Sequence, residues 1–317
     1  MTLAPESLVG QAVGPYTVTA LLGGGGMAWV LAANDADGCP GVALKLLKPK
    51  YAGDVQFTAR FLNEATVAGE LRHPNIIRIL DVGQHGEAVY FAMPQLLGSL
   101  AERLGDDAAL PEQDVMRIAR DVARAMAFAH EAGVIHRDIK PQNLFLTPEA
   151  GGFQTRILDF GLAKSLSSSS PLTQTGTIIG TPLYMAPEQV LGRNVDERTD
   201  TFAFASVVYE ALLGISPVRA TVLSEIMSDI LHAPVLPPSQ FVSWLTPEID
   251  AGFAHALSKD PAERPENPVG WAENLACRLE SLGSPRDGWP DLAQASDSRS
   301  SLSTGDLATT QSAVHPG

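Results

Sequence analysis

One short stretch constrains this chain more than any other: the eight residues 136–143, which read HRDIKPQN. They place a carboxylate (Asp138), an ammonium (Lys140) and a carboxamide (Asn143) within six positions. Pro141 lacks a backbone N–H and has a fixed φ, so the stretch is expected to form a shaped loop rather than a helix. Its six fixed identities should arise by chance on the order of once in 10⁵ sequences of this length. A solvated loop with a chance cluster of charges is therefore the weaker interpretation.

These three groups suit phosphoryl transfer. A carboxylate can orient a hydroxyl and accept its proton, and an ammonium can neutralise phosphate charge. The amide oxygen of an asparagine can bind a hard metal ion. We therefore expect Asp138 to act as the base, Lys140 to stabilise charge and Asn143 to hold a metal.

The composition limits the partners. The chain has 317 residues, of which 45% are hydrophobic and 18% are charged, so it can bury the cores of two packed lobes or domains. Its formal net charge of −14 argues against a nucleic-acid backbone or an anionic membrane as the main partner. The charge is compatible with basic protein substrates, although an acidic surface needs no partner at all.

Cysteine content and hydropathy bear on the compartment. Cys39 and Cys277 lie far apart and form neither a metal-binding pattern nor a disulfide framework. The first ten residues lack the positive stretch and apolar run of a secretory signal. The longest apolar stretch, residues 202–215, is too short to span a bilayer. We expect a cytoplasmic protein with no membrane span.

A run of four glycines, residues 23–26, follows an apolar and β-branched stretch over residues 16–22. The pattern predicts a strand, a glycine turn and a second strand. Such a flap can bring backbone N–H groups close to phosphate oxygens. Taken alone, an ordinary glycine-rich hairpin tip explains the run equally well. The chain contains no GxxxxGK[ST] motif, which excludes a P-loop NTPase at the motif level.

Lys45 ends the stretch VALK, which reads as a strand. On its own, this lysine could equally point to solvent from an edge strand. Apolar residues at helical spacing over residues 57–68 place Glu64 among apolar neighbours. A lysine and a glutamate that are each unfavourable beside a core can pair, which favours an ion pair between Lys45 and Glu64.

The rest of the chain is mainly helical in pattern. We expect a helix over residues 110–133, a helix buried on every side over residues 198–214, and a last helix over residues 271–282. Short strands are expected at residues 134–135 and 144–146. From residue 284 onward periodicity disappears, which predicts a disordered tail or a linker to further domains.

Three further stretches follow the loop. Asp159 begins the triplet DFG after a short apolar run, and a Ser- and Thr-rich segment over residues 164–181 contains Thr173 and Thr175 in TQT. The composition of that segment favours mobility. It ends in GTPLYMAPE over residues 180–188.

In this order and at these intervals, the motifs over residues 14–282 resemble those of bacterial eukaryotic-type (Hanks-type) serine/threonine protein kinases. The resemblance implies a bilobal α+β fold, with a small β-rich N-terminal lobe that carries one key helix and a larger, mostly helical lobe. The implied division is an N-terminal extension over 1–13, an N-lobe over 14–93, a hinge over 94–98, a C-lobe over 99–283 and a Ser/Thr-rich tail over 284–317.

The resemblance also implies residue roles around ATP and Mg²⁺, or Mn²⁺ in its place. The catalytic set is Asp138, Lys140, Asn143 and Thr181, and the metal ligands are Asn143 and Asp159. The residues expected to bind ATP are Leu22, Gly23, Gly24, Gly25, Gly26, Met27, Ala28, Trp29, Val30, Ala43, Lys45, Glu64, Met93, Leu96 and Phe145. One position departs from the family pattern: Ala28 stands where the flap has its third glycine, which bears on ATP affinity.

By the same resemblance, the chain transfers the γ-phosphate of ATP to Ser/Thr hydroxyls of proteins and is activated by autophosphorylation at Thr173 and Thr175. Arg137 can pair with a phosphothreonine and order the loop. A flexible hydroxyl-rich loop that carries no phosphate is the simpler alternative. A phosphorylated tail would also suit a phosphothreonine-binding partner.

The resemblance gives further residues a structural role: Asp200 anchors the catalytic loop, and Arg264 pairs with Glu188. Two rival functions remain. A pseudokinase or scaffold would not need the base and metal residues that this chain retains. A small-molecule phosphotransferase would not be expected to combine Lys140 with the GT…APE segment.

Overall fold

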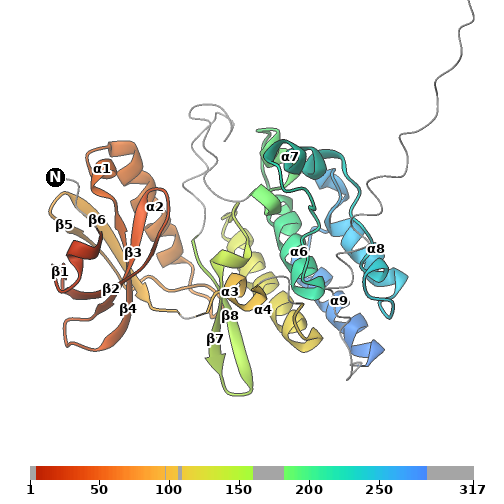
Figure 1. Ribbon diagram of the computed structural model, residues 1–317, viewed down its shortest axis with the longest axis horizontal. Helices are drawn as coiled ribbons and strands as arrows, with labels where there is room; N and C mark the ends of the chain where they lie inside the picture. Colours follow the sequence, from red (N-terminus) through yellow and green to blue (C-terminus); the bar gives the residue numbers. More distant parts are fainter. Residues whose placement is uncertain (1–4, 97, 106–108, 160–181, 284–317) are drawn as a thin grey trace, which may run out of the picture.

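The computed structural model describes residues 5–96, 98–105, 109–159 and 182–283. Thr173, Thr175, Thr181 and the segment 284–317, which carry several of the predictions above, lie outside this part of the chain. In Figure 1 the N-terminal elements form a sheet flanked by two helices, and the later elements form a mostly helical second region.

The N-terminal region is a six-stranded antiparallel sheet with the strand order β1-β2-β3-β4-β6-β5. Its elements are η1 (Pro5–Leu8), β1 (Ala12–Val13), β2 (Tyr16–Gly24), β3 (Ala28–Asn34), β4 (Pro40–Leu47), α1 (Pro49–Ala52), α2 (Val55–Glu70), β5 (Asp81–His85) and β6 (Ala88–Pro94). The strand expected over residues 16–22 and the helix expected around residues 57–68 are both present.

The alternation of side chains along β4 gives the sheet two different faces. Val42, Leu44 and Leu46 belong to one buried cluster, with residues of β2, β3 and β6. Ala43 and Leu47 belong to another cluster, which includes residues of α2. Lys45 lies between these last two in the alternation, so the strand period places it on the face that α2 covers.

The second region combines seven helices and one hairpin among the described residues. They are α3 (Leu100–Leu104), α4 (Glu112–Glu131), β7 (Leu144–Glu149), β8 (Gly152–Ile157), α5 (Pro187–Val190), α6 (Glu197–Leu213), α7 (Leu223–His232), α8 (Pro247–Ala256) and α9 (Pro268–Leu282). Short 3₁₀ turns are η2 (Pro141–Asn143), η4 (Pro182–Tyr184), η5 (Pro238–Gln240) and η6 (Pro261–Glu263).

Helix α6 is the centre of this region. Asp196 caps its first turn by accepting the backbone N–H of Arg198, and Gly214 ends it in a left-handed conformation at φ 70°. Nearly all of its residues are buried, as the sequence predicted, and α4 and α8 pack against it. None of the helices in the described part of the chain is long and apolar enough to cross a bilayer.

The strand predicted at residues 134–135 does not form. The backbone N–H of Val134 donates to the carbonyl of Ala129 at 2.9 Å, and Gly133 has a positive φ of 72°. These residues therefore close the C-terminal end of α4, which satisfies a carbonyl that the helix would otherwise leave unpaired. The prediction was wrong because a short apolar run after a helix also suits a helix terminus.

Candidate active site

Lys45 joins three distant parts of the chain. Its ammonium nitrogen lies 2.7 Å from Oε1 of Glu64 on α2 and 2.7 Å from Oδ1 of Asp159, just after β8. The side chains of Lys45 and Glu64 are only 12% and 8% exposed, whereas that of Asp159 is 32% exposed. The pairing of Lys45 with Glu64 that the helical pattern suggested is therefore present. Asp159 is the more open member of the cluster.

Two carboxylates share this one ammonium. Burial alone would lower the pKa of Lys45, but the charges of Asp159 and Glu64 outweigh it and raise that pKa, so the lysine is charged. Burial raises the pKa of Glu64 to about 7; Lys45 opposes this shift, and the neighbouring Asp159 adds to it. Glu64 is thus poised to change its charge near neutral pH.

The three groups of the HRDIKPQN stretch also meet. Lys140 Nζ donates to Oδ2 of Asp138 at 2.8 Å, and Asn143 Nδ2 donates to the backbone carbonyl of Asp138 at 2.8 Å. The backbone N–H of Leu158 donates to the carbonyl of Asn143 at 2.8 Å. The loop that carries Asp138 is thereby tied to the residue before Asp159.

Asp200 holds the other side of this loop. One carboxylate oxygen accepts the backbone N–H of His136 and the other accepts that of Arg137, each at 2.7 Å. Asp200 is fully buried at the start of α6, and His130 of α4 lies 2.9 Å from its Oδ2. The anchoring role expected for Asp200 is confirmed. Arg137 has a positive φ of 66°, an unfavourable backbone conformation that these bonds help to fix.

The imidazole of His136 links the two loops. Its Nδ1 lies 3.2 Å from the backbone N–H of Asp138, and its Nε2 lies 3.0 Å from the carbonyl of Leu158. A neutral ring with the proton on Nε2 satisfies both contacts, whereas a proton on Nδ1 would face another donor. Burial lowers the pKa of His136, although the carboxylates of Asp200 and Asp138 oppose the shift.

The glycine run forms the turn between β2 and β3. Gly24 pairs with Trp29 at the end of the two strands, and the N–H of Gly25 donates to the carbonyl of Ala28 at 3.0 Å. Gly23 lies in β2 opposite Val30. The Ala28 side chain is buried in the same cluster as Phe61 of α2, so its methyl group packs into the core below the turn.

Most apolar residues predicted to contact ATP gather in one place. The cluster under the sheet includes Met27, Ala28, Val30, Ala43, Met93 and Leu96, together with Leu158. Trp29 packs instead against the cluster on the opposite face of the sheet. Leu22 is 46% exposed, and Phe145 is a half-buried residue of β7 that forms a β-bridge with Ser99.

Glu188, the last residue of the APE motif, and Gln189 directly after it make further contacts near the site. Arg264 pairs with both carboxylate oxygens of Glu188, as the resemblance implied, and Thr199 donates to the same carboxylate at 2.7 Å. Gln189 donates to the carbonyl of Arg137 at 2.9 Å. Sequence reasoning missed Gln189; a polar residue directly after that motif was the available signal.

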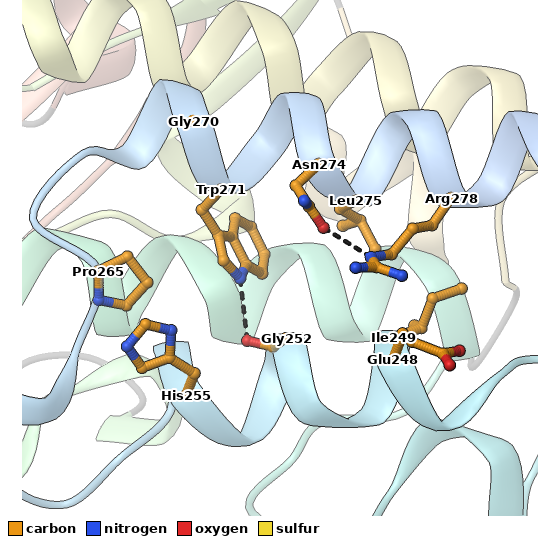
Figure 2. A pocket seen from close by; sticks show the side chains of 10 residues that line it. All are labelled: Glu248, Ile249, Gly252, His255, Pro265, Gly270, Trp271, Asn274, Leu275 and Arg278. Atoms are coloured by element: carbon orange, nitrogen blue, oxygen red, sulfur yellow. Dashed lines mark hydrogen bonds between the residues drawn. The ribbon is translucent and has the colours of Figure 1, made fainter.

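A cavity of 320 Å³ lies apart from these residues, between α8 and α9 (Figure 2). Trp271 Nε1 donates to the carbonyl of Gly252 across it at 2.9 Å, and His255 and Pro265 line the same end. None of the residues predicted to bind ATP or metal lines this cavity. It is therefore separate from the cluster around Lys45.

The comparisons with known proteins agree with this geometry. The family model of the protein kinase domain matches residues 16–272. The serine/threonine-protein kinase PknJ of Mycobacterium tuberculosis is 35% identical over 290 residues, which cover 90% of this chain and 49% of that protein. PknD of the same organism is 38% identical over 258 residues, covering 81% of this chain and 38% of that protein. The chain thus spans about half the length, or less, of these curated relatives.

A solved structure is similar as well. The crystal structure of the Mycobacterium tuberculosis PknI kinase domain has 31% sequence identity and a TM-score of 0.64, covering 87% of this chain and 99% of that one. The chain belongs to the protein kinase family and has its bilobal α+β fold. The family resemblance drawn from the motifs is confirmed.

Proposed function

We propose that this chain is an ATP- and Mg²⁺-dependent serine/threonine protein kinase, which transfers the γ-phosphate of ATP to Ser/Thr hydroxyls of proteins. One observation carries the proposal: Lys45 contacts both Glu64 and Asp159, which come from separate elements. Burying these charges adds little stability, because the cost of desolvation offsets much of their attraction, so a role in binding phosphate explains the cluster better. The relatives PknJ and PknD, both named serine/threonine-protein kinases, support the choice of substrate class.

The roles follow from the contacts of each group. Asp138 orients the substrate hydroxyl and accepts its proton, and Lys140, 2.8 Å away, stabilises the charge of the phosphate in transfer. Lys45 would neutralise charge on the phosphates of bound ATP. Thr181, outside the described residues, is proposed to bridge Asp138 and Lys140.

The side chains also fit a hard divalent cation. Asn143 donates through Nδ2 toward Asp138, which leaves its amide oxygen as an acceptor, and Asp159 supplies a partly exposed carboxylate. Mg²⁺ is commonly held by one or two protein oxygens together with substrate phosphates and water. Asn143 and Asp159 would hold the ion, which when bound offsets the negative charge of the phosphates.

The remaining predictions complete the proposal. The glycine turn with Met27, Ala28 and Trp29, and the cluster residues Val30, Ala43, Met93 and Leu96, are proposed to contact ATP, with Leu22 and Phe145 at the edges of the adenine site. We keep the lobe boundaries at residues 93–99, the tail over residues 284–317 and the phosphothreonine-binding partner as proposals. The cytoplasmic location and the lack of a nucleic-acid partner stay predictions from composition.

Activation by autophosphorylation has its own structural support. Arg137 is held next to Asp138 by Asp200, and its Nε is buried without a hydrogen-bond partner among the described residues. A buried guanidinium N–H without an acceptor is unfavourable, and a phosphate supplies strong acceptors. Phosphorylated Thr173 or Thr175 is proposed as that acceptor.

The test is transfer of labelled phosphate from ATP, with Mg²⁺ or Mn²⁺, to a generic basic protein. The wild-type chain should label itself and the added protein, and Asp138→Asn and Lys45→Met should each remove most of the transfer. Lys50→Met is a matched control, because Lys50 lies on α1 with its ammonium over the ring of Tyr51. Nucleotide binding without transfer by the wild-type chain would indicate a pseudokinase instead.

A further inference from the structure

Lys48 makes two contacts with the glycine turn. It follows β4, three positions after Lys45, and is half-buried. Its ammonium donates to the carbonyl of Gly25 at 2.5 Å. Its backbone N–H donates to the carbonyl of Met27 at 2.9 Å. The residue after β4 thereby holds the turn between β2 and β3.

The turn has little other support at this point. The pairing of β2 with β3 ends at Gly24 and Trp29, and the bond from Gly25 to Ala28 closes the hairpin. A side chain added at Gly23 or Gly25 would meet no heavy atom within 4 Å, so no other residue packs on that side of these glycines. Consecutive glycines sample many conformations, and a bond to one of their carbonyls removes much of that freedom.

Among the described residues, Lys48 donates such a side-chain hydrogen bond to a carbonyl of this turn. We propose that Lys48 is a positioning residue, which holds the glycine turn in the shape that receives the triphosphate of ATP. The nucleotide part of this inference rests on the proposed kinase function. Without the bond to Gly25, the turn would adopt the conformation that binds ATP in a smaller fraction of molecules. The apparent affinity for ATP would fall in proportion to that population.

The variants follow from the two contacts. Lys48→Met keeps most of the apolar stem and removes the ammonium, while the backbone bond to Met27 remains. Lys48→Arg restores a charged donor of similar length. Lys50→Met serves as the control, because it removes a nearby ammonium that lies over Tyr51 instead of the turn.

The first measurement is hydrogen–deuterium exchange of the full chain without nucleotide. Lys48→Met should exchange faster over residues 22–28 and as wild type over α4 and α6, and Lys48→Arg and Lys50→Met should match the wild type. Unchanged exchange over residues 22–28 in Lys48→Met would overturn the proposal. This result requires no enzymatic activity, so it stands or fails separately from the proposed function.

The second measurement is steady-state phosphate transfer at varied ATP. Because the bond from Lys48 to Gly25 is exposed to water, its loss should cost less than that of a buried charged bond: Lys48→Met should raise KM for ATP about three- to tenfold while kcat stays within about twofold. Lys48→Arg should restore KM. A fall in kcat at unchanged KM would contradict the proposal, because Lys48 would then act on the transferring phosphate. If the wild-type chain transfers no phosphate, the kinase proposal fails and the exchange result remains.

Discussion

Arg264 holds Glu188 with two parallel hydrogen bonds, Nη1 to Oε1 at 2.7 Å and Nη2 to Oε2 at 2.8 Å. The two residues are 76 positions apart, and both are buried. Paired planar groups of this kind combine charge with a fixed geometry. The pair therefore fixes the APE motif to the turn after α8.

Breaking this pair should destabilise the fold strongly. Arg264→Met would leave the carboxylate of Glu188 buried beside Thr199 without its counter-charge, which should cost about 3–5 kcal/mol of unfolding free energy. Chemical denaturation at neutral pH measures the change. The double variant Arg264→Met with Glu188→Leu should recover part of the loss, and equal stability of the single variant and the wild type would contradict the prediction.

His136 should make stability depend on pH. The pKa of His136 is lowered from its ordinary 6.5 by burial, so the unfolded chain binds a proton at a higher pH than the folded chain does. Its contribution to stability is therefore complete above pH 6.5 and declines as the pH falls below that value.

Denaturation at pH 7.5 and 5.5 tests this dependence. His136→Gln retains an acceptor and a donor for Asp138 and Leu158 but does not titrate in this range. The difference in stability between the two pH values should be smaller in this variant than in the wild type. An unchanged difference would show that other groups cause it.

Glu64 should make phosphate transfer depend on pH near neutrality. Since burial raises the pKa of Glu64 to about 7, its charge, and with it the ion pair with Lys45, is lost as the pH falls through that value. We expect kcat/KM for ATP to rise as the pH is raised through about 7. Glu64→Gln should lack this rise. The substitution weakens the hydrogen bond from the charged Lys45 by about 1.5–3 kcal/mol, so kcat/KM should fall roughly ten- to 150-fold. If kcat/KM of the wild type and of Glu64→Gln rose in parallel with pH, the titrating group would be a residue other than Glu64.

The chain should phosphorylate its own segment after Asp159. Mass spectrometry of protein made in a phosphatase-free host should find phosphate on Thr173 or Thr175, and none in the inactive Asp138→Asn variant. Arg137→Met should retain the phosphate but lose the activation, because the proposed partner of the phosphate is removed. Full activity of the double variant Thr173→Ala, Thr175→Ala, which cannot carry phosphate at these positions, would contradict activation by autophosphorylation.

The sequence predicted the elements and the pairs that depend on local periodicity. Helical spacing around Glu64 placed it toward the core, where the structure finds it next to Lys45. The inference for Glu64 needs only the period of an element and the cost of an unpaired charge. The anchoring role of Asp200 came instead from the family resemblance, and the backbone N–H groups of His136 and Arg137 confirm it.

Contacts between loops could not be predicted in the same way. The bond from Gln189 to the carbonyl of Arg137 spans 52 positions and depends on the path of two irregular segments. The ammonium of Lys48 meets Gly25 because three strands end near one another, which no periodicity records. The direct contact of Lys45 with Asp159 was also missed, because each residue had been assigned to a phosphate or a metal rather than to the other.

The alternation along β4 sets a limit on how this chain can change in length. Lys45 lies on the face toward α2 while Leu44 and Leu46 lie on the other, so one added or deleted residue inside β4 would turn the lysine away from Glu64. The turn over residues 35–39, which is largely exposed, carries no such requirement. Natural variants should therefore gain or lose residues in that turn and keep the length of β4 unchanged.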